Sequence, residues 1–230
     1  SLFFAVGGMM ACAAAAAVAF PGAPAGVAEG GPHAPHRIPR VLWLMVLGVG
    51  CLALNQNIMF SFLERIGIVR GYGREGVNGV LAAVGIVNLF AAPLAGVLQR
   101  RLPAVGVALG AGVVQVALAV TITASGGFVP YAVAGSLYAF VMIFAHPFLF
   151  GLTARLDPSG RTNALTPAML MAGSALAPAI AGTVAQRFGF GGLGVAVAAV
   201  GIVGFTSFAL LARALRRTTA SALPSTPIAG

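Results

Sequence analysis

Three consecutive amide side chains, Asn55, Gln56 and Asn57, lie in the middle of an apolar stretch over residues 41–63, and Ser61 follows them by one helical turn. On a helix, three consecutive residues spread over about 200° of the surface, so one close-packed neighbour cannot satisfy all three amides. Polar groups inside hydrocarbon need a hydrogen-bond partner or a water-filled cavity. The spacing therefore predicts a wet cavity in which these four side chains hydrogen-bond to a small solute.

A second group of candidate residues recurs at four-residue spacing within the apolar stretch 128–152. Tyr138, Met142 and His146 share one helix face at that spacing. Tyr138 and Met142 are expected to form an adaptable apolar wall of the cavity. Imidazole titrates near physiological pH, so His146 is expected to contact the solute or carry a coupling proton. The alternative is a neutral His146 that bonds a carbonyl freed by Pro147.

Two single amides occur in other apolar stretches, Asn88 near the middle of 77–98 and Gln115 within 104–124. A lone amide in a membrane helix often hydrogen-bonds a neighbouring helix. It contacts a ligand instead when it faces a cavity. Both alternatives stay open for these residues, and Asn88 is included among the solute-binding candidates.

The sequence holds no pattern of catalytic residues. It contains no HExxH or GxSxG motif and no pair of Asp or Glu in the middle of an apolar stretch, so an enzyme is not expected. All 13 basic residues are Arg and none is Lys, which excludes a retinal Schiff base and a Walker-type phosphate loop. Cys12 and Cys51 lie in apolar stretches without metal-ligand spacing, and neither a metal nor a cofactor is expected.

The composition requires a membrane around these residues. Of the 230 residues, 59% are hydrophobic and 7% are charged, whereas about 25% are charged in soluble domains. The mean hydropathy is +0.99, and a soluble fold of this size has no means of hiding so much apolar surface. The chain is therefore predicted to be an all-α polytopic membrane protein. Its partner is expected to be the lipid bilayer and not a nucleic acid, despite a net charge of +9.

Seven stretches are apolar over about 20 residues, the length that crosses a bilayer as a helix. Gly, Pro or Arg occurs in every break between them, as expected of turns. The predicted spans are 2–20, 41–63, 77–98, 104–124, 128–152, 163–185 and 192–212.

The spans divide the chain into four parts. Residues 21–40 are rich in Pro and Gly and are predicted to form a cytoplasmic linker. This linker separates a single helix, 1–20, from a six-helix bundle over 41–217, and residues 218–230 are predicted to be a flexible cytoplasmic tail. Because Ser1 begins inside an apolar stretch, the chain is expected to be a fragment that lacks its original N-terminus.

Arginines in the predicted connections indicate the orientation. One side holds nine of them and the other holds four, accompanied by Glu64 and Glu75. By the positive-inside rule the side with nine is cytoplasmic, and so is the C-terminus. Tyr72 and Tyr131 lie near the opposite interface, where they are expected to act as membrane anchors. The nine are Arg37, Arg40, Arg100, Arg101, Arg155, Arg161, Arg213, Arg216 and Arg217.

This organisation resembles the C-terminal half of a major facilitator superfamily transporter, in which six spans with short loops follow a cytoplasmic linker. Residues Gly173-Ser-Ala-Leu-Ala177-Pro178-Ala-Ile-Ala181-Gly182 resemble the antiporter motif of that family, G-x-x-x-G-P-x-x-G-G, with Ala in place of Gly at 177 and 181. The family carries this motif on its fifth helix. The present span would be the eleventh, which is equivalent under the internal repeats of the fold.

Two predicted cytoplasmic connections add to the resemblance. Residues Gly96-Val-Leu-Gln-Arg100-Arg101-Leu-Pro103 resemble the loop signature G-x-L-x-D-R-x-G, with Arg100 where the signature has Asp. Residues 157–161, DPSGR, resemble the connection that precedes the eleventh helix. The resemblance implies a charge cluster that favours one of two conformations, formed by Arg100, Arg101, Asp157 and Arg161.

The resemblance implies a half-bundle of two inverted three-helix repeats, preceded by one extra transmembrane helix. Gly173 would permit close helix packing, and Pro178 would bend its helix and act as a pivot. The implied function is secondary active transport of a small organic solute by alternating access, coupled to protons and directed to efflux. The implied partner is the N-terminal half of the same transporter, in a bacterial inner membrane.

Two other functions fit the number and composition of the spans. Seven spans with an external N-terminus are also the arrangement of a membrane receptor. A structural membrane protein, in which the amides only join helices, is the other alternative.

Overall fold

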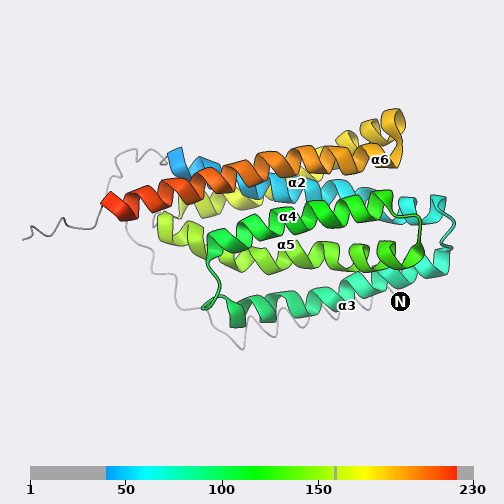
Figure 1. The fold of residues 1–230 in the computed structure, drawn as a ribbon, viewed down its shortest axis with the longest axis horizontal. Coiled ribbons are helices and arrows are strands. Elements are labelled where there is room, and N and C mark those ends of the chain that lie inside the picture. Colours follow the sequence, from blue (N-terminus) through cyan, green and yellow to red (C-terminus); the bar gives the residue numbers. More distant parts are fainter. Residues whose placement is uncertain (1–39, 158–159, 222–230) are drawn as a thin grey trace, which may run out of the picture. The chain divides into compact units, whose positions relative to one another are not determined.

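The computed structural model describes residues 40–157 and 160–221 of the chain (Figure 1). In these residues every regular element is a helix, and no strand occurs. All five helices contain a segment long and apolar enough to cross a membrane, as the composition predicts. The helices are α2 (Arg40–Val69), α3 (Arg74–Leu98), α4 (Ala104–Ala124), α5 (Phe128–Leu156) and α6 (Arg161–Ser221).

Most of the predicted spans agree closely with these helices. The first four spans after the linker lie inside α2, α3, α4 and α5. The predicted helix 1–20 and all of the predicted linker 21–40 except Arg40 lie outside the described residues. α6 continues to Ser221, so the first four residues of the predicted tail 218–230 are helical, and residues 222–230 lie outside the described residues.

α6 spans 61 residues and consists of two helical arms that meet at Gly189, where the backbone is not helical. There φ is 67° and ψ is −170°, a conformation that is open to Gly and strained for other residues. A straight helix of this length would measure about 90 Å, three times the thickness of the hydrocarbon core. Figure 1 shows the chain turning back instead, with the second arm (orange to red) returning along the bundle. The two arms, 161–188 and 190–221, contain the last two predicted spans.

The connections between helices lie at two opposite ends of the bundle (Figure 1). One end holds the α3–α4 and α5–α6 connections, the start of α2 and the end of α6. We call it the arginine-rich end, because it holds Arg40, Arg100, Arg101, Arg155, Arg161, Arg213, Arg216 and Arg217. The other end holds the remaining turns, the bend at Gly189, and Arg65, Arg70, Arg74 and Arg187. The cytoplasmic location of the arginine-rich end stays a prediction.

α2 is the central helix, because it contacts every other described helix and contributes to both hydrophobic core clusters. It approaches the first arm of α6 closely at the buried Gly173, where an added Cβ would lie 3.4 Å from the backbone nitrogen of Leu54. Ala177 and Ala181 continue this stripe of small residues and are fully buried. The two helices are therefore near enough for their polar side chains to meet.

The remaining helices pair selectively. α3 packs on α5, and α4 packs on α5 and on α6, while α3 contacts neither α4 nor α6 within residues 40–157 and 160–221. Two glycines of α6 lie against α4, Gly194 beside Thr123 and Gly201 beside Val116. The second arm of α6 is therefore the arm that packs on α4.

Substitution of Gly189 by Val is expected to destabilise the fold. A side chain at positive φ costs about 1–3 kcal/mol, because it strains the backbone that reverses α6. The matched control is Gly182→Ala, since Gly182 is helical and a Cβ there would meet no other atom within 4 Å. Titration of the purified protein with SDS in mixed micelles, followed by circular dichroism, measures both variants. Equal stability of Gly189→Val and Gly182→Ala would contradict the bend.

Candidate functional site

The three consecutive amides of α2 bond to different helices, because each residue turns the side chain by about 100°. Asn55 donates from Nδ2 to the carbonyl oxygen of Val197 in the second arm of α6, at 3.1 Å. Gln56 accepts at Oε1 a hydrogen bond from Nε2 of Gln115 on α4, at 3.3 Å. Asn57 lies against the first arm of α6. Neighbours in the sequence thus do not share one face.

Asn55, Gln56 and Gln115 form a group that we call the interior amide cluster. Gln115 is fully buried, and its Nε2 also donates to the carbonyl oxygen of Leu52, at 3.2 Å. Asn55 is buried as well, and its backbone carbonyl accepts from the hydroxyl of Tyr138 on α5, at 3.0 Å. The cluster connects α2 to α4, α5 and α6 from inside the bundle. Such bonds join helices in a membrane.

Asn57, Ser61 and Ser174 form a different group, which we call the midspan polar face. Ser174 donates from Oγ to Oδ1 of Asn57 at 3.1 Å, so this pair bridges α2 and the first arm of α6. Nδ2 of Asn57 donates to the carbonyl oxygen of Ala53, and Ser61 donates to the carbonyl oxygen of Asn57, each at 2.8 Å. Ser61 and Ser174 are exposed, and Asn57 is half-buried. These polar groups therefore lie on the outer surface of the described bundle.

The midspan polar face lies halfway along two helices. Asn57 is near the centre of the 30-residue α2, and Ser174 is near the centre of the first arm of α6. Phe60 and Glu64 are also exposed and continue the same side of α2, since they follow Asn57 by three and seven residues. The face thus leads from the middle of the bundle to the end that carries Glu64.

The candidate residues of α5 lie mostly inside the bundle. Tyr138 and Met142 are buried, and Met142 belongs to a core cluster with Val49 of α2. His146 stacks on Phe150 with ring centroids 5.4 Å apart. The helix presents these side chains to the core because α2, α3 and α4 all pack on α5.

Five buried side-chain atoms in the helices have no hydrogen-bond partner among the described residues. They are Oδ1 of Asn55, Oε1 of Gln115, Oδ1 of Asn163, Nε2 of His146 and Oδ1 of Asn88. His146 and Asn88 lie near the middle of their helices, α5 and α3. An unpaired buried polar atom is costly, so each position is suited to a water molecule or a ligand group.

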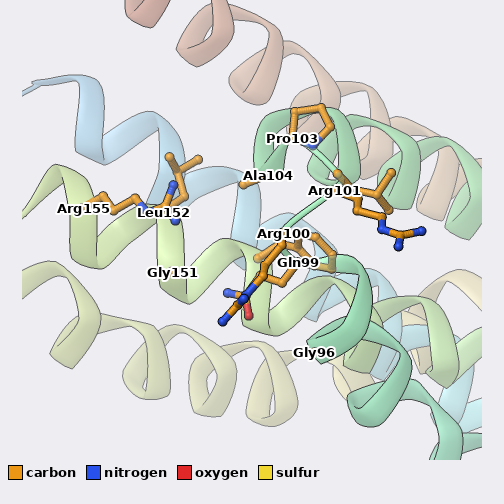
Figure 2. Close-up of a pocket in the computed structure, with 11 residues that line it drawn as sticks. Gly96, Gln99, Arg100, Arg101, Pro103, Ala104, Gly151, Leu152 and Arg155 are labelled. Atoms are coloured by element: carbon orange, nitrogen blue, oxygen red, sulfur yellow. The ribbon is translucent and has the colours of Figure 1, made fainter.

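The residues expected to form a charge cluster separate into two places. Arg100 and Arg101 line a cavity at the α3–α4 turn together with Gly96 and with Arg155 of α5, and we call this cavity the arginine pocket (Figure 2). The carboxylate of Asp157 accepts from the backbone nitrogen and hydroxyl of Thr162, at 2.8 and 2.6 Å, at the start of α6. The side chain of Arg161 lies outside the described residues. Gly173 packs against α2, and Pro178 is exposed.

Two residues near the opposite end have contacts that the sequence did not predict. The membrane-anchor prediction for Tyr131 is wrong, because the side chain is fully buried and its hydroxyl donates to the carbonyl oxygen of Leu63 at 2.8 Å. The sequence places Arg70 in a connection, and the structure adds that its guanidinium donates to the carbonyl oxygens of Ile122, Thr123 and Ser125. A cation at the C-terminal end of α4 complements the helix dipole.

Comparison with known proteins does not extend this description. No protein-family model matches the chain, and no curated protein or solved structure matches it. Within residues 40–157 and 160–221, no group of three His, Cys, Asp or Glu side chains is placed to hold a metal ion.

Replacing Gln115 by Leu is expected to lower the free energy of unfolding by about 1 kcal/mol, because the interior amide cluster loses the bonds to Leu52 and Gln56. The matched control is Gln186→Leu, since Gln186 is an exposed amide near the end of the first arm. The measurement is again an SDS titration followed by circular dichroism. If both variants unfold at the same SDS concentration, Gln115 does not join the helices.

Proposed function

We propose that residues 40–221 form one half of a secondary transporter of the major facilitator type, which moves a small organic solute across the bilayer by alternating access. The observation that carries the proposal is the midspan polar face. Asn57, Ser61 and Ser174 present amide and hydroxyl groups at the outer surface, halfway along otherwise apolar helices. Hydrocarbon does not solvate the donor and acceptor sites that these groups leave unused, so this face favours contact with water or a polar ligand.

The midspan polar face keeps hydrogen-bonding capacity for a solute. The amide nitrogen of Asn57 has two protons and uses one of them on Ala53. The hydroxyl oxygens of Ser61 and Ser174 each donate within the protein and can still accept. Neutral donors and acceptors without a fixed charge suit a small polar organic solute.

The pairing of the helices supports two inverted three-helix repeats. The first repeat is α2, α3 and α4, and the second is α5 with the two arms of α6. The main helix contacts stay the same when each helix is exchanged for its equivalent: α2 for α5, α3 for the first arm of α6, and α4 for the second arm. α2 packs on both arms of α6, near Gly173 and Gly204, and α5 packs correspondingly on α3 and α4. Because each repeat would cross the membrane three times, the second repeat would start on the opposite side of the membrane from the first.

The partner in this proposal is a second bundle of the same transporter, which covers the midspan polar face. Transporters with internal repeats bind solute near the middle of the membrane, between two bundles that rock against each other. The stripe of Gly173, Ala177 and Ala181 lets the first arm of α6 lie close to α2, and Pro178 on its exposed side weakens the helix at that level. The solute would then meet α2 and α6 from this bundle.

His146 is the group that we assign to proton coupling. Its imidazole lies near the middle of α5, and Nε2 has no partner among the described residues. The likeness of residues 173–182 to the antiporter motif supports export in exchange for protons. The excess of arginine at one end supports a cytoplasmic C-terminus in an inner membrane.

A structural membrane protein is the alternative that a specific observation favours. The interior amide cluster joins helices without needing any solute. The midspan polar face differs from it, because Ser61 and Ser174 remain exposed. Whether water reaches that face therefore decides between the two functions.

Cysteines at positions 57, 61 and 174 are expected to react with a membrane-impermeant thiol reagent. The variants Asn57→Cys, Ser61→Cys and Ser174→Cys are made with Cys12 and Cys51 replaced by Ala, and the intact protein is tested in membrane vesicles. Thiolate forms readily only in water, so modification should be at least about tenfold faster than at lipid-facing positions. Reagent is applied from each side separately, and alternating access predicts reaction from both.

The matched controls are Ile86→Cys and Ile202→Cys. Both side chains are well exposed, at 60% and 67%, and each lies near the middle of its helical segment, on α3 and the second arm of α6. Slow reaction at these positions shows that exposure alone does not admit the reagent. Equally slow reaction at 57, 61 and 174 would refute a wet face and with it the transporter.

A further inference from the structure

The arginine pocket is a cavity of about 940 Å³ at the arginine-rich end of the bundle. Arg100 and Arg101 come from the α3–α4 turn, and Arg155 comes from the last turn of α5 (Figure 2). An added Cβ on Gly96 would meet no atom within 4 Å, and one on Gly151 would lie 3.0 Å from Nε2 of Gln99. Two helices and a turn thus surround an open space with three positive charges.

The positive charge of the arginine pocket is not neutralised by the protein. No Asp or Glu lines the cavity, and among the described residues the three guanidinium groups make no ion pair or hydrogen bond. Glu64 and Glu75 lie at the other end of the bundle, and Asp157 binds Thr162. An anion in the pocket would offset this positive charge and could form charge-assisted hydrogen bonds with an arginine.

The start of α4 adds to the attraction for an anion. Ala104, the first residue of α4, lies on the wall of the cavity, and no side chain caps the helix. The first backbone N–H groups of a helix have no partner within it and carry partial positive charge. Phosphate groups bind at such positions.

The surroundings of the pocket favour a lipid over a soluble anion. Phe90, Leu94 and Val97 on α3 are 64%, 43% and 69% exposed and follow one side of the helix toward the α3–α4 turn, which carries Arg100 and Arg101. α3 contacts only α2 and α5 among the described helices, so this apolar stripe is free to hold acyl chains. A cationic pocket at the end of an apolar stripe matches the two parts of a phospholipid.

We propose that the arginine pocket binds the phosphate of an anionic phospholipid, whose acyl chains lie along the exposed stripe of α3. Basic pockets between transmembrane helices hold such head groups, and anionic lipid is concentrated in the cytoplasmic leaflet. The inference goes beyond the proposed transport function and does not depend on it. A bound lipid would fix the α3–α4 turn relative to α5 and place this end at the cytoplasmic surface.

Native mass spectrometry of the full chain in neutral detergent tests this proposal. Phosphatidylglycerol and phosphatidylcholine with identical acyl chains are titrated separately, and phosphatidylglycerol is expected to bind more tightly. The variant R100Q/R101Q/R155Q should lose this preference, by about fivefold in affinity for each arginine removed. The variant R100K/R101K/R155K keeps the charge and should keep most of the preference.

The matched control is R65Q/R74Q/R187Q, which removes three exposed arginines from the opposite end. It should leave the preference for phosphatidylglycerol unchanged, and size-exclusion profiles confirm that each variant is folded. An equal loss in this control, or equal affinity for both lipids in the parent protein, would overturn the proposal. Inorganic phosphate is titrated as a competitor, and complete displacement at low millimolar concentration would identify a site for a soluble anion instead.

Discussion

The whole structure depends on one constraint, that polar groups inside hydrocarbon must be hydrogen-bonded or in contact with water. The helices satisfy the backbone internally, which leaves the side-chain amides and hydroxyls of the spans. The amide groups of Asn55, Gln56 and Gln115 hydrogen-bond across helices, although Oδ1 of Asn55 and Oε1 of Gln115 have no partner among the described residues. Asn57, Ser61 and Ser174 are hydrogen-bonded within the bundle as well, but Asn57 is half-buried and the two serines are exposed at mid-depth, so their remaining donor and acceptor sites face outward. This difference separates the residues that build the bundle from the residues proposed to bind a solute.

The interior amide cluster and the small residues of α6 both hold α6 against α2. Gly173, Ala177 and Ala181 let the first arm of α6 approach α2. The same closeness brings Ser174 within 3.1 Å of Asn57. One hydrogen bond, from Asn55 to the carbonyl oxygen of Val197, joins α2 to the second arm. The site is therefore held by packing on one side and by buried amides on the other, while the arginine pocket lies apart at the end of α3.

Crossing segments were predictable from the sequence because length and hydropathy are local properties, and Gly189 supplies a visible break between 163–185 and 192–212. The direction in which each amide points was not predictable. Consecutive residues among 55–57 are rotated by about 100° around the axis of α2, and the rotation of α2 about that axis depends on every helix packed against it. The same reason explains the wrong prediction for Tyr131, whose burial follows from α5 packing on α2. Gln115 is the one amide of its span, which indicates that it has a polar partner. The identity of that partner was not predictable, because Gln56 is 59 residues away in the sequence.

The most direct test of the central claim is the solvent around a nitroxide spin label at position 57, in the intact protein in liposomes. Electron paramagnetic resonance measures how often the label collides with oxygen, which partitions into lipid, and with a nickel chelate, which stays in water. The ratio of the two collision rates shows whether lipid or water surrounds the label. The account predicts that a label at 57 collides mainly with the nickel chelate and that the same label at position 86 on α3 collides mainly with oxygen. A label at 57 that prefers oxygen as strongly as one at 86 would contradict the account, because Asn57 would then face acyl chains.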